Sequence, residues 1–105
     1  MEAQRLLYKN HVFDALNKAV EEVYGHDLNH YMQRCRQREF VEVRQMAMYL
    51  YRQETGFSLH EIGKIFGKHH ATIIFAIKQV EGLRSVDVAF SRDFSILQET
   101  FKKYL

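Results

Sequence analysis

The sequence predicts an all-helical protein with one domain. The chain has 105 residues, which is enough for one compact domain and no more. Apolar residues make up 47% of it, so a core can form. Proline is absent and glycine occurs only five times, which leaves few residues that break helices. Apolar residues recur at helical spacing, with no strand-like alternation of useful length.

The first predicted helix runs from Ala3 to Tyr24, and Gly25 is its expected stop. Its apolar stripe repeats roughly every seven residues and consists of Leu6, Phe13, Leu16, Val20 and Val23. This repeat is too short for a coiled coil. We expect the rest of the chain to cover the stripe, chiefly through the side of the second helix that carries Val41 and Met48. A second copy of the chain, or a protein partner, is the alternative cover.

After a connector at residues 26–30, a second helix is predicted from about Gln37 to Glu54. Its buried stripe has 3-4-3 spacing and consists of Phe40, Val43, Ala47 and Leu50. At about 100° per residue, Arg38, Gln45 and Arg52 fall on the opposite side of this helix.

The segment from residue 58 to residue 80 has the layout of a helix-turn-helix. Ser58 and Glu61 form a capping box that opens a short helix ending near Phe66 and Gly67. A fourth helix follows from about His69 to Arg84. A loop at residues 85–90 and a last helix at residues 91–104 complete the chain.

The fourth helix is predicted to have one open face and one core face. The residues within about 60° of Thr72 are Lys68, His69, Phe75, Ala76 and Gln79. The isoleucines on the other side are Ile73, Ile74 and Ile77. The predicted core of the whole chain consists of Phe40, Val43, Ala47, Leu50, Ile62, Phe66, Ile73, Ile77 and Val80.

Several blocks of sequence occur in the order and at the spacing of a known family. These blocks are Arg44-Gln-Met-Ala-Met-Tyr-Leu50, Ser58-Leu59, Ile62-Gly63, Phe66-Gly67 and Lys68-His-His-Ala-Thr-Ile73. They resemble the C-terminal DNA-binding domain of the bacterial replication initiator DnaA. The resemblance covers roughly residues 30–105, and residues 1–29 form an additional N-terminal helix and connector. It implies a fold similar to the Trp repressor and binding of a short box in double-stranded DNA.

The resemblance also implies which residues contact DNA. Bases in the major groove would be contacted by His69, His70, Ala71 and Thr72, and the adjacent minor groove by Arg36. Phosphates would be contacted by Arg38, Arg44, Gln45, Arg52, Leu59, His60, Lys68 and Ala76. A local charge excess agrees with this, because residues 31–72 carry seven Lys and Arg against four Glu.

The chain departs from the family pattern where bases would be read. The family has Asp-His-Thr-Thr where this chain has His69-His70-Ala71-Thr72, and Phe75 replaces a usual histidine. One glycine of the turn is also missing. We therefore expect a DnaA-like box that is altered at the base pairs facing His69 and Ala71.

The motifs of other function classes are missing from the sequence. No phosphate-binding loop of the G-x-x-x-x-G-K-[ST] type occurs, and Lys64 interrupts the only start of an H-E-x-x-H zinc motif. Cys35 is the only cysteine, and no catalytic triad or dyad can be identified. We expect no enzyme activity, no cofactor and no metal.

Two functions remain open on the sequence. The first is sequence-specific binding of double-stranded DNA linked to replication initiation or its regulation, as a competitor of DnaA, a repressor or a mobile-element protein. The alternative is a protein-interaction module that kept the fold and lost specific DNA binding. The N-terminus lacks the apolar stretch of a signal peptide, and no apolar run reaches the ~20 residues of a membrane span. We expect a cytoplasmic, nucleoid-associated protein.

Overall fold

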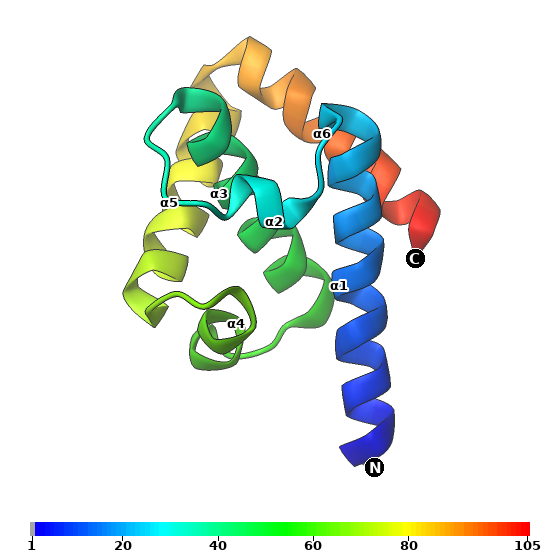
Figure 1. The fold of residues 1–105 in the computed structure, drawn as a ribbon. Helices are drawn as coiled ribbons and strands as arrows, with labels where there is room; N and C mark the ends of the chain where they lie inside the picture. Colours follow the sequence, from blue (N-terminus) through cyan, green and yellow to red (C-terminus); the bar gives the residue numbers. More distant parts are fainter. Residues whose placement is uncertain (1) are drawn as a thin grey trace.

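The computed structural model describes residues 2–105 and confirms the all-helical class, with six helices and no strand in that range (Figure 1). The helices are α1 (Glu2–Tyr24), α2 (Leu28–Tyr31), α3 (Arg38–Thr55), α4 (Leu59–Phe66), α5 (His70–Val86) and α6 (Val88–Tyr104).

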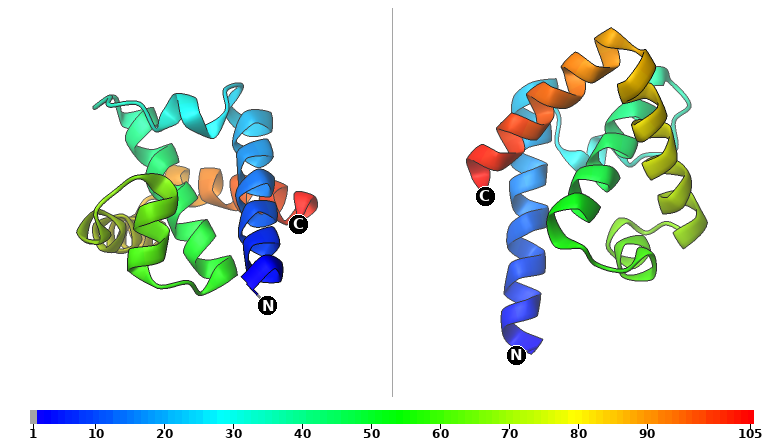
Figure 2. Two further views of the ribbon diagram at one scale, coloured as in Figure 1. Left: turned by 60° about the horizontal axis from the view of Figure 1, so that its bottom comes forward. Right: turned by 180° about the vertical axis from the view of Figure 1, so that it is seen from behind.

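α3 lies in the middle of the molecule, between α1 on one side and α5 on the other. α6 returns from the end of α5 and crosses α1, as the view from behind shows (Figure 2). The first turns of α1 extend beyond the other helices (Figure 1). This arrangement surrounds α3 with apolar partners. Its buried residues therefore occupy more than one side, and they are Val43, Met46, Ala47, Met48, Leu50 and Tyr51.

The predicted core is largely confirmed. The buried members are Val43, Ala47, Leu50, Ile62, Phe66, Ile73 and Val80. Phe40 and Ile77 are half-buried and pack against the edge of the same core. One core cluster includes residues of all six helices, so α1 shares its apolar contacts with the helix-turn-helix.

The stripe predicted for the first helix differs from the one that is buried. The buried residues of α1 are Val12, Ala15, Leu16, Ala19 and Val20, whereas Leu6 is 54% exposed. The predicted cover by Val41 and Met48 was wrong, because both line a groove that faces α5. α1 packs chiefly against α6 instead. α6 is far away in the chain, so local periodicity could not reveal this contact.

Two connections are more ordered than their sequences suggested. The connector after α1 contains the one-turn helix α2, whose first N–H, on Leu28, donates to Asn17 Oδ1 at 2.7 Å. The predicted loop at residues 85–90 was wrong, because α6 begins at Val88 directly after Asp87. The Asp87 carboxylate accepts the Phe90 N–H at 3.0 Å and so caps α6 without any longer loop.

Candidate nucleic-acid interface

The helix-turn-helix is built by α4, a short turn and α5. Ser58 caps α4 by accepting the Glu61 N–H at 3.2 Å, which is the serine half of the predicted capping box. Gly67 ends α4 in the left-handed region, with a φ of 65°. His69 then caps α5, since its Nδ1 accepts the Ala71 N–H at 3.1 Å. Each helix end is therefore determined by residues next to it in the chain.

Gly63 lets the turn approach α4 closely. A Cβ at this position would lie 2.5 Å from the carbonyl oxygen of Lys68, a distance that no side chain can accept. Glycine is therefore required for packing here, although its backbone is ordinary helix. The sequence contained the Ile-Gly pair, but it gave no reason for the glycine.

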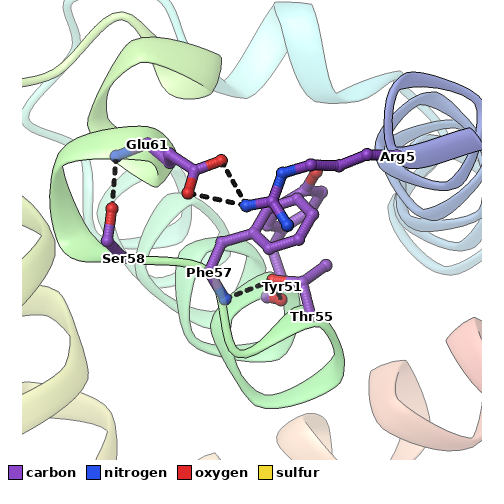
Figure 3. A network of polar contacts seen from close by, with 6 residues as sticks. All are labelled: Arg5, Tyr51, Thr55, Phe57, Ser58 and Glu61. Carbon is purple, nitrogen blue, oxygen red and sulfur yellow. Dashed lines mark hydrogen bonds and ion pairs between the residues drawn. The ribbon is translucent and has the colours of Figure 1, made fainter. Parts of the chain in front are cut away.

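The opposite end of α4 is tied to α1 through Glu61 (Figure 3). Instead of bonding back to Ser58, the Glu61 carboxylate accepts two hydrogen bonds from Arg5 Nη2, at 2.7 and 2.8 Å. The Arg5 guanidinium also lies over the Phe57 ring, 4.2 Å from its centroid. Arg5 lowers the pKa of Glu61 through this pairing. The contact joins the N-terminal part of α1 to the helix-turn-helix.

The open face of α5 carries most of the residues expected there. Its exposed residues include His69 at the cap and then Ala71, Thr72, Phe75, Lys78 and Gln79. Ala76 is only 1% exposed, although it lines the groove between α3 and α5, and its expected phosphate contact stays a prediction. It lies three residues after Ile73 and four before Val80, on the stripe that packs against α3.

A groove between α3 and α5 brings several of the predicted contact residues together. Its lining consists of Val41, Arg44, Gln45, Met48, Lys68, Thr72, Phe75 and Ala76. The groove thus combines apolar side chains with two cationic side chains and polar groups from both helices. Charged and amide donors in this arrangement suit an anionic backbone, with apolar atoms beneath it.

Arg44 is also the residue that holds the loop before α3. Its Nη1 donates to the carbonyls of Tyr31 and Gln33, at 3.1 and 2.7 Å, and its Nη2 donates to that of Cys35 at 2.8 Å. The loop carries Arg36, which is exposed. The sequence indicated a phosphate contact for Arg44 and did not reveal this positioning contact, because it depends on a loop folding back over α3.

The loop with Arg36 leads into Arg38, which lies at the end of α5 opposite to His69. Arg38, which follows the loop, is 77% exposed at its side chain and pairs with Glu42 and with Asp87 at the end of α5. With 17 residues, α5 is about 25 Å long. This length exceeds the width of the major groove of DNA, which is about 12 Å.

The remaining predicted phosphate contacts differ in exposure. His60 is exposed, and Leu59 is half-buried against the core. Arg52 is half-buried, and its Nη1 is buried without a hydrogen-bond partner among the described residues. A buried guanidinium nitrogen without an acceptor is uncommon.

Three histidines cluster at the turn. The ring of His70 lies 4.2 Å, centroid to centroid, from those of both His60 and His69. Desolvation lowers the pKa of His70, and the neighbouring His60 and His69 lower it further. No group of three His, Cys, Asp or Glu side chains within residues 2–105 could hold a metal ion. None of the helices in this range is long and apolar enough to span a membrane.

Comparison with known proteins identifies the family. Residues 13–80 match the model of the bacterial DnaA protein helix-turn-helix. The match begins inside α1, at residue 13, whereas the resemblance was expected to start at about residue 30.

Known relatives agree with this match. The chain is 44% identical over 71 residues, 67% of its length, to the chromosomal replication initiator protein DnaA of Bacteroides fragilis. It is 34% identical over 99 residues, 93% of its length, to the protein of that name from Ehrlichia ruminantium. It spans 15% and 21% of those two proteins. By the match over residues 13–80 and these identities, the chain belongs to the bacterial DnaA helix-turn-helix family.

Proposed function

We propose that this protein binds double-stranded DNA in a sequence-dependent manner, with the start of α5 in the major groove. One observation carries the proposal. The buried stripe of α5 packs against α3, and its open face shares a groove with Gln45 and Lys68. A helix anchored on one side and lined with donors on the other is the geometry of a recognition helix.

The contacts divide into two kinds. Arg44, Gln45, Arg52 and Lys68 are proposed to bind phosphates and so to set the position of the protein on the duplex. Lys68 supports this role, since it lines the groove and makes no salt bridge among the described residues. Arg38, Leu59 and His60 remain further candidates for phosphate contacts.

Base edges are proposed to be read at both ends of α5. His69, His70, Ala71 and Thr72 would face the major groove, and Arg36 the adjacent minor groove. Three observations support this assignment. His69, Ala71 and Thr72 are exposed at the start of the helix, Arg36 is exposed, and Arg44 holds the loop that carries Arg36.

Family membership supports DNA binding linked to replication initiation. At DnaA-like boxes, binding would serve initiation, competition with DnaA or repression, and the match to the helix-turn-helix of replication initiators fits each of these roles. Each of these roles is non-enzymatic and takes place at the nucleoid.

The alternative is a protein-interaction module. The exposed apolar residues of α1, Leu6 at 54% and Leu7 at 69%, favour it, because neighbouring apolar side chains open to solvent offer a surface to a protein partner.

In vitro selection of bound duplexes from a random pool tests the proposal. We expect one preferred box, related to the DnaA box, and a cost of about 1–3 kcal/mol for each wrong base pair. The double variant His69→Asp with Ala71→Thr should move the preference toward the usual DnaA box. If no sequence is preferred over bulk DNA, the interaction module becomes the better function. If both proteins prefer the usual box equally, these two positions do not set specificity.

A further inference from the structure

Phe75 is more exposed to solvent than any other phenylalanine of the chain. The chain has eight phenylalanines, all within the described residues, and the other seven are buried or half-buried. Phe75 is 57% exposed. It contributes nothing central to the core, because Ile73, Ala76 and Val80 form the buried stripe of α5. The fold therefore gives no reason for a large aromatic ring here.

The ring lies within the surface already assigned to DNA. Phe75 lines the groove between α3 and α5 together with Lys68 and Thr72. Ala71 is exposed one helical turn earlier on the same side, since residues four apart lie one above the other. Ala71 and Phe75 thus form an apolar strip next to the polar side chains at the start of α5.

The chemistry of the major groove restricts what can face such a strip. Base edges there present hydrogen-bond donors and acceptors, and the 5-methyl group of thymine is the apolar exception. An aromatic ring pressed against a polar edge would leave that edge without its water and without a partner, which costs free energy. When the ring packs against a thymine methyl, both apolar groups are removed from water, which is favourable.

We propose that Phe75 is a specificity-determining residue that reads a thymine through its 5-methyl group, at a base pair next to the one that faces Ala71. The inference rests on the proposed function. It adds a base-reading position beyond the four residues at the start of α5. The ring carries no charge, so it contributes to sequence preference and leaves the phosphate contacts unchanged.

Replacing thymine by deoxyuridine tests the proposal, because this change removes the methyl group and keeps the base pair. Each thymine of the selected box is replaced in turn, and affinity is measured by fluorescence anisotropy at constant salt. For the unaltered protein we expect one position, beyond those that depend on Ala71, where the change weakens binding by about fourfold, the value for losing one buried methyl-sized group. For Phe75→Ala, binding to the thymine duplex should weaken and the effect of deoxyuridine at that position should vanish.

Val88→Ala is the matched control, since Val88 is another exposed apolar residue and lies at the start of α6, away from the groove. This variant should keep the full effect of deoxyuridine. Phe75→Ala removes an exposed side chain, and circular dichroism should show an unchanged helix content.

If Phe75→Ala responds to deoxyuridine as the unaltered protein does at every position, the inference about Phe75 is overturned and DNA binding stands. If selection yields no preferred box at all, the proposed function fails, which is a different result. The salt dependence of binding identifies a third outcome, in which Phe75→Ala alters the phosphate contacts. A change in its slope on Phe75→Ala would show an effect on phosphate contacts and would also overturn the proposal.

Discussion

At Gly63, the absence of a Cβ lets the turn approach α4 closely. The carbonyl oxygen of Lys68 occupies the space that a Cβ would need, so the backbone of the turn lies directly against α4. The positions of Lys68, His69 and the start of α5 follow from this contact. The stability of the fold and its affinity for DNA should therefore both depend on having glycine at position 63.

Gly63→Ala should lower the free energy of unfolding by about 1–3 kcal/mol, as overpacking does, and should weaken DNA binding because the turn must shift. Gly82→Ala is the matched control. A Cβ at Gly82 meets nothing within 4 Å, and alanine favours helix over glycine, so this variant should gain about 0.5–1 kcal/mol. Thermal denaturation checks both. Equal stability of the two variants would show that the approach of Lys68 to α4 is not tight.

His70 should make stability depend on pH. Its pKa in the folded protein lies below the ordinary value of 6.5 because of desolvation and the adjacent His60 and His69. Above pH 6.5 the group is neutral in both states. As pH falls below 6.5, the unfolded chain takes up the proton first, so the free energy of unfolding decreases until the folded pKa is reached.

Denaturant titrations between pH 5 and pH 8 check this sign. His70→Gln should flatten the curve, and His60→Gln should flatten part of it by removing one source of repulsion. Stability that increases on acidification through this range would contradict the expectation.

At the scale of elements, the groove between α3 and α5 is lined by two cations, Arg44 and Lys68, that have different surroundings. Arg44 holds the loop with Arg36 through three hydrogen bonds to backbone carbonyls. Lys68, at the turn, lines the groove facing α3 and makes no salt bridge among the described residues. Substituting each one should therefore give a different result.

Lys68→Ala should weaken binding to all duplexes alike and lower the salt slope by about one unit. Arg44→Ala should in addition raise hydrogen exchange in residues 31–37 and reduce stability by about 1.5–3 kcal/mol, the value for hydrogen bonds to a charged group. DNA affinity measured at several salt concentrations checks the prediction for Lys68→Ala. Hydrogen-exchange rates of the free protein check the prediction for Arg44→Ala. An unchanged exchange rate for Arg44→Ala would show that the loop does not need it.

At the scale of the whole molecule, α1 belongs to the same core as the helix-turn-helix. Its buried residues pack against α6 and α3, and Lys103 of α6 pairs with Glu22 of α1 at 2.7 Å. Exposed ion pairs of this kind contribute little, so the apolar contacts dominate.

Leu16→Ala should lower the free energy of unfolding by about 2–5 kcal/mol, within one cooperative transition, because Leu16 is fully buried. Leu7→Ala is the matched control on the same helix. Leu7 is 69% exposed, and its loss should change stability by no more than about 0.5 kcal/mol. Two separate transitions for Leu16→Ala would instead mark α1 as an independent unit.

The sequence by itself determined the five longer helices, apart from the start of α6, and the helix-turn-helix, because their signals are local. Ser58 and Gly67 act within a few residues of themselves, and the motif of residues 58–73 is continuous in the chain. Only the tertiary structure decided which surfaces are open. Ala76 is buried because α3 lies against it, α1 is covered because α6 returns across it, and Arg44 holds a loop because that loop folds back over it. The physical reason is that burial depends on neighbours far away in the chain, which the period of a single helix cannot specify.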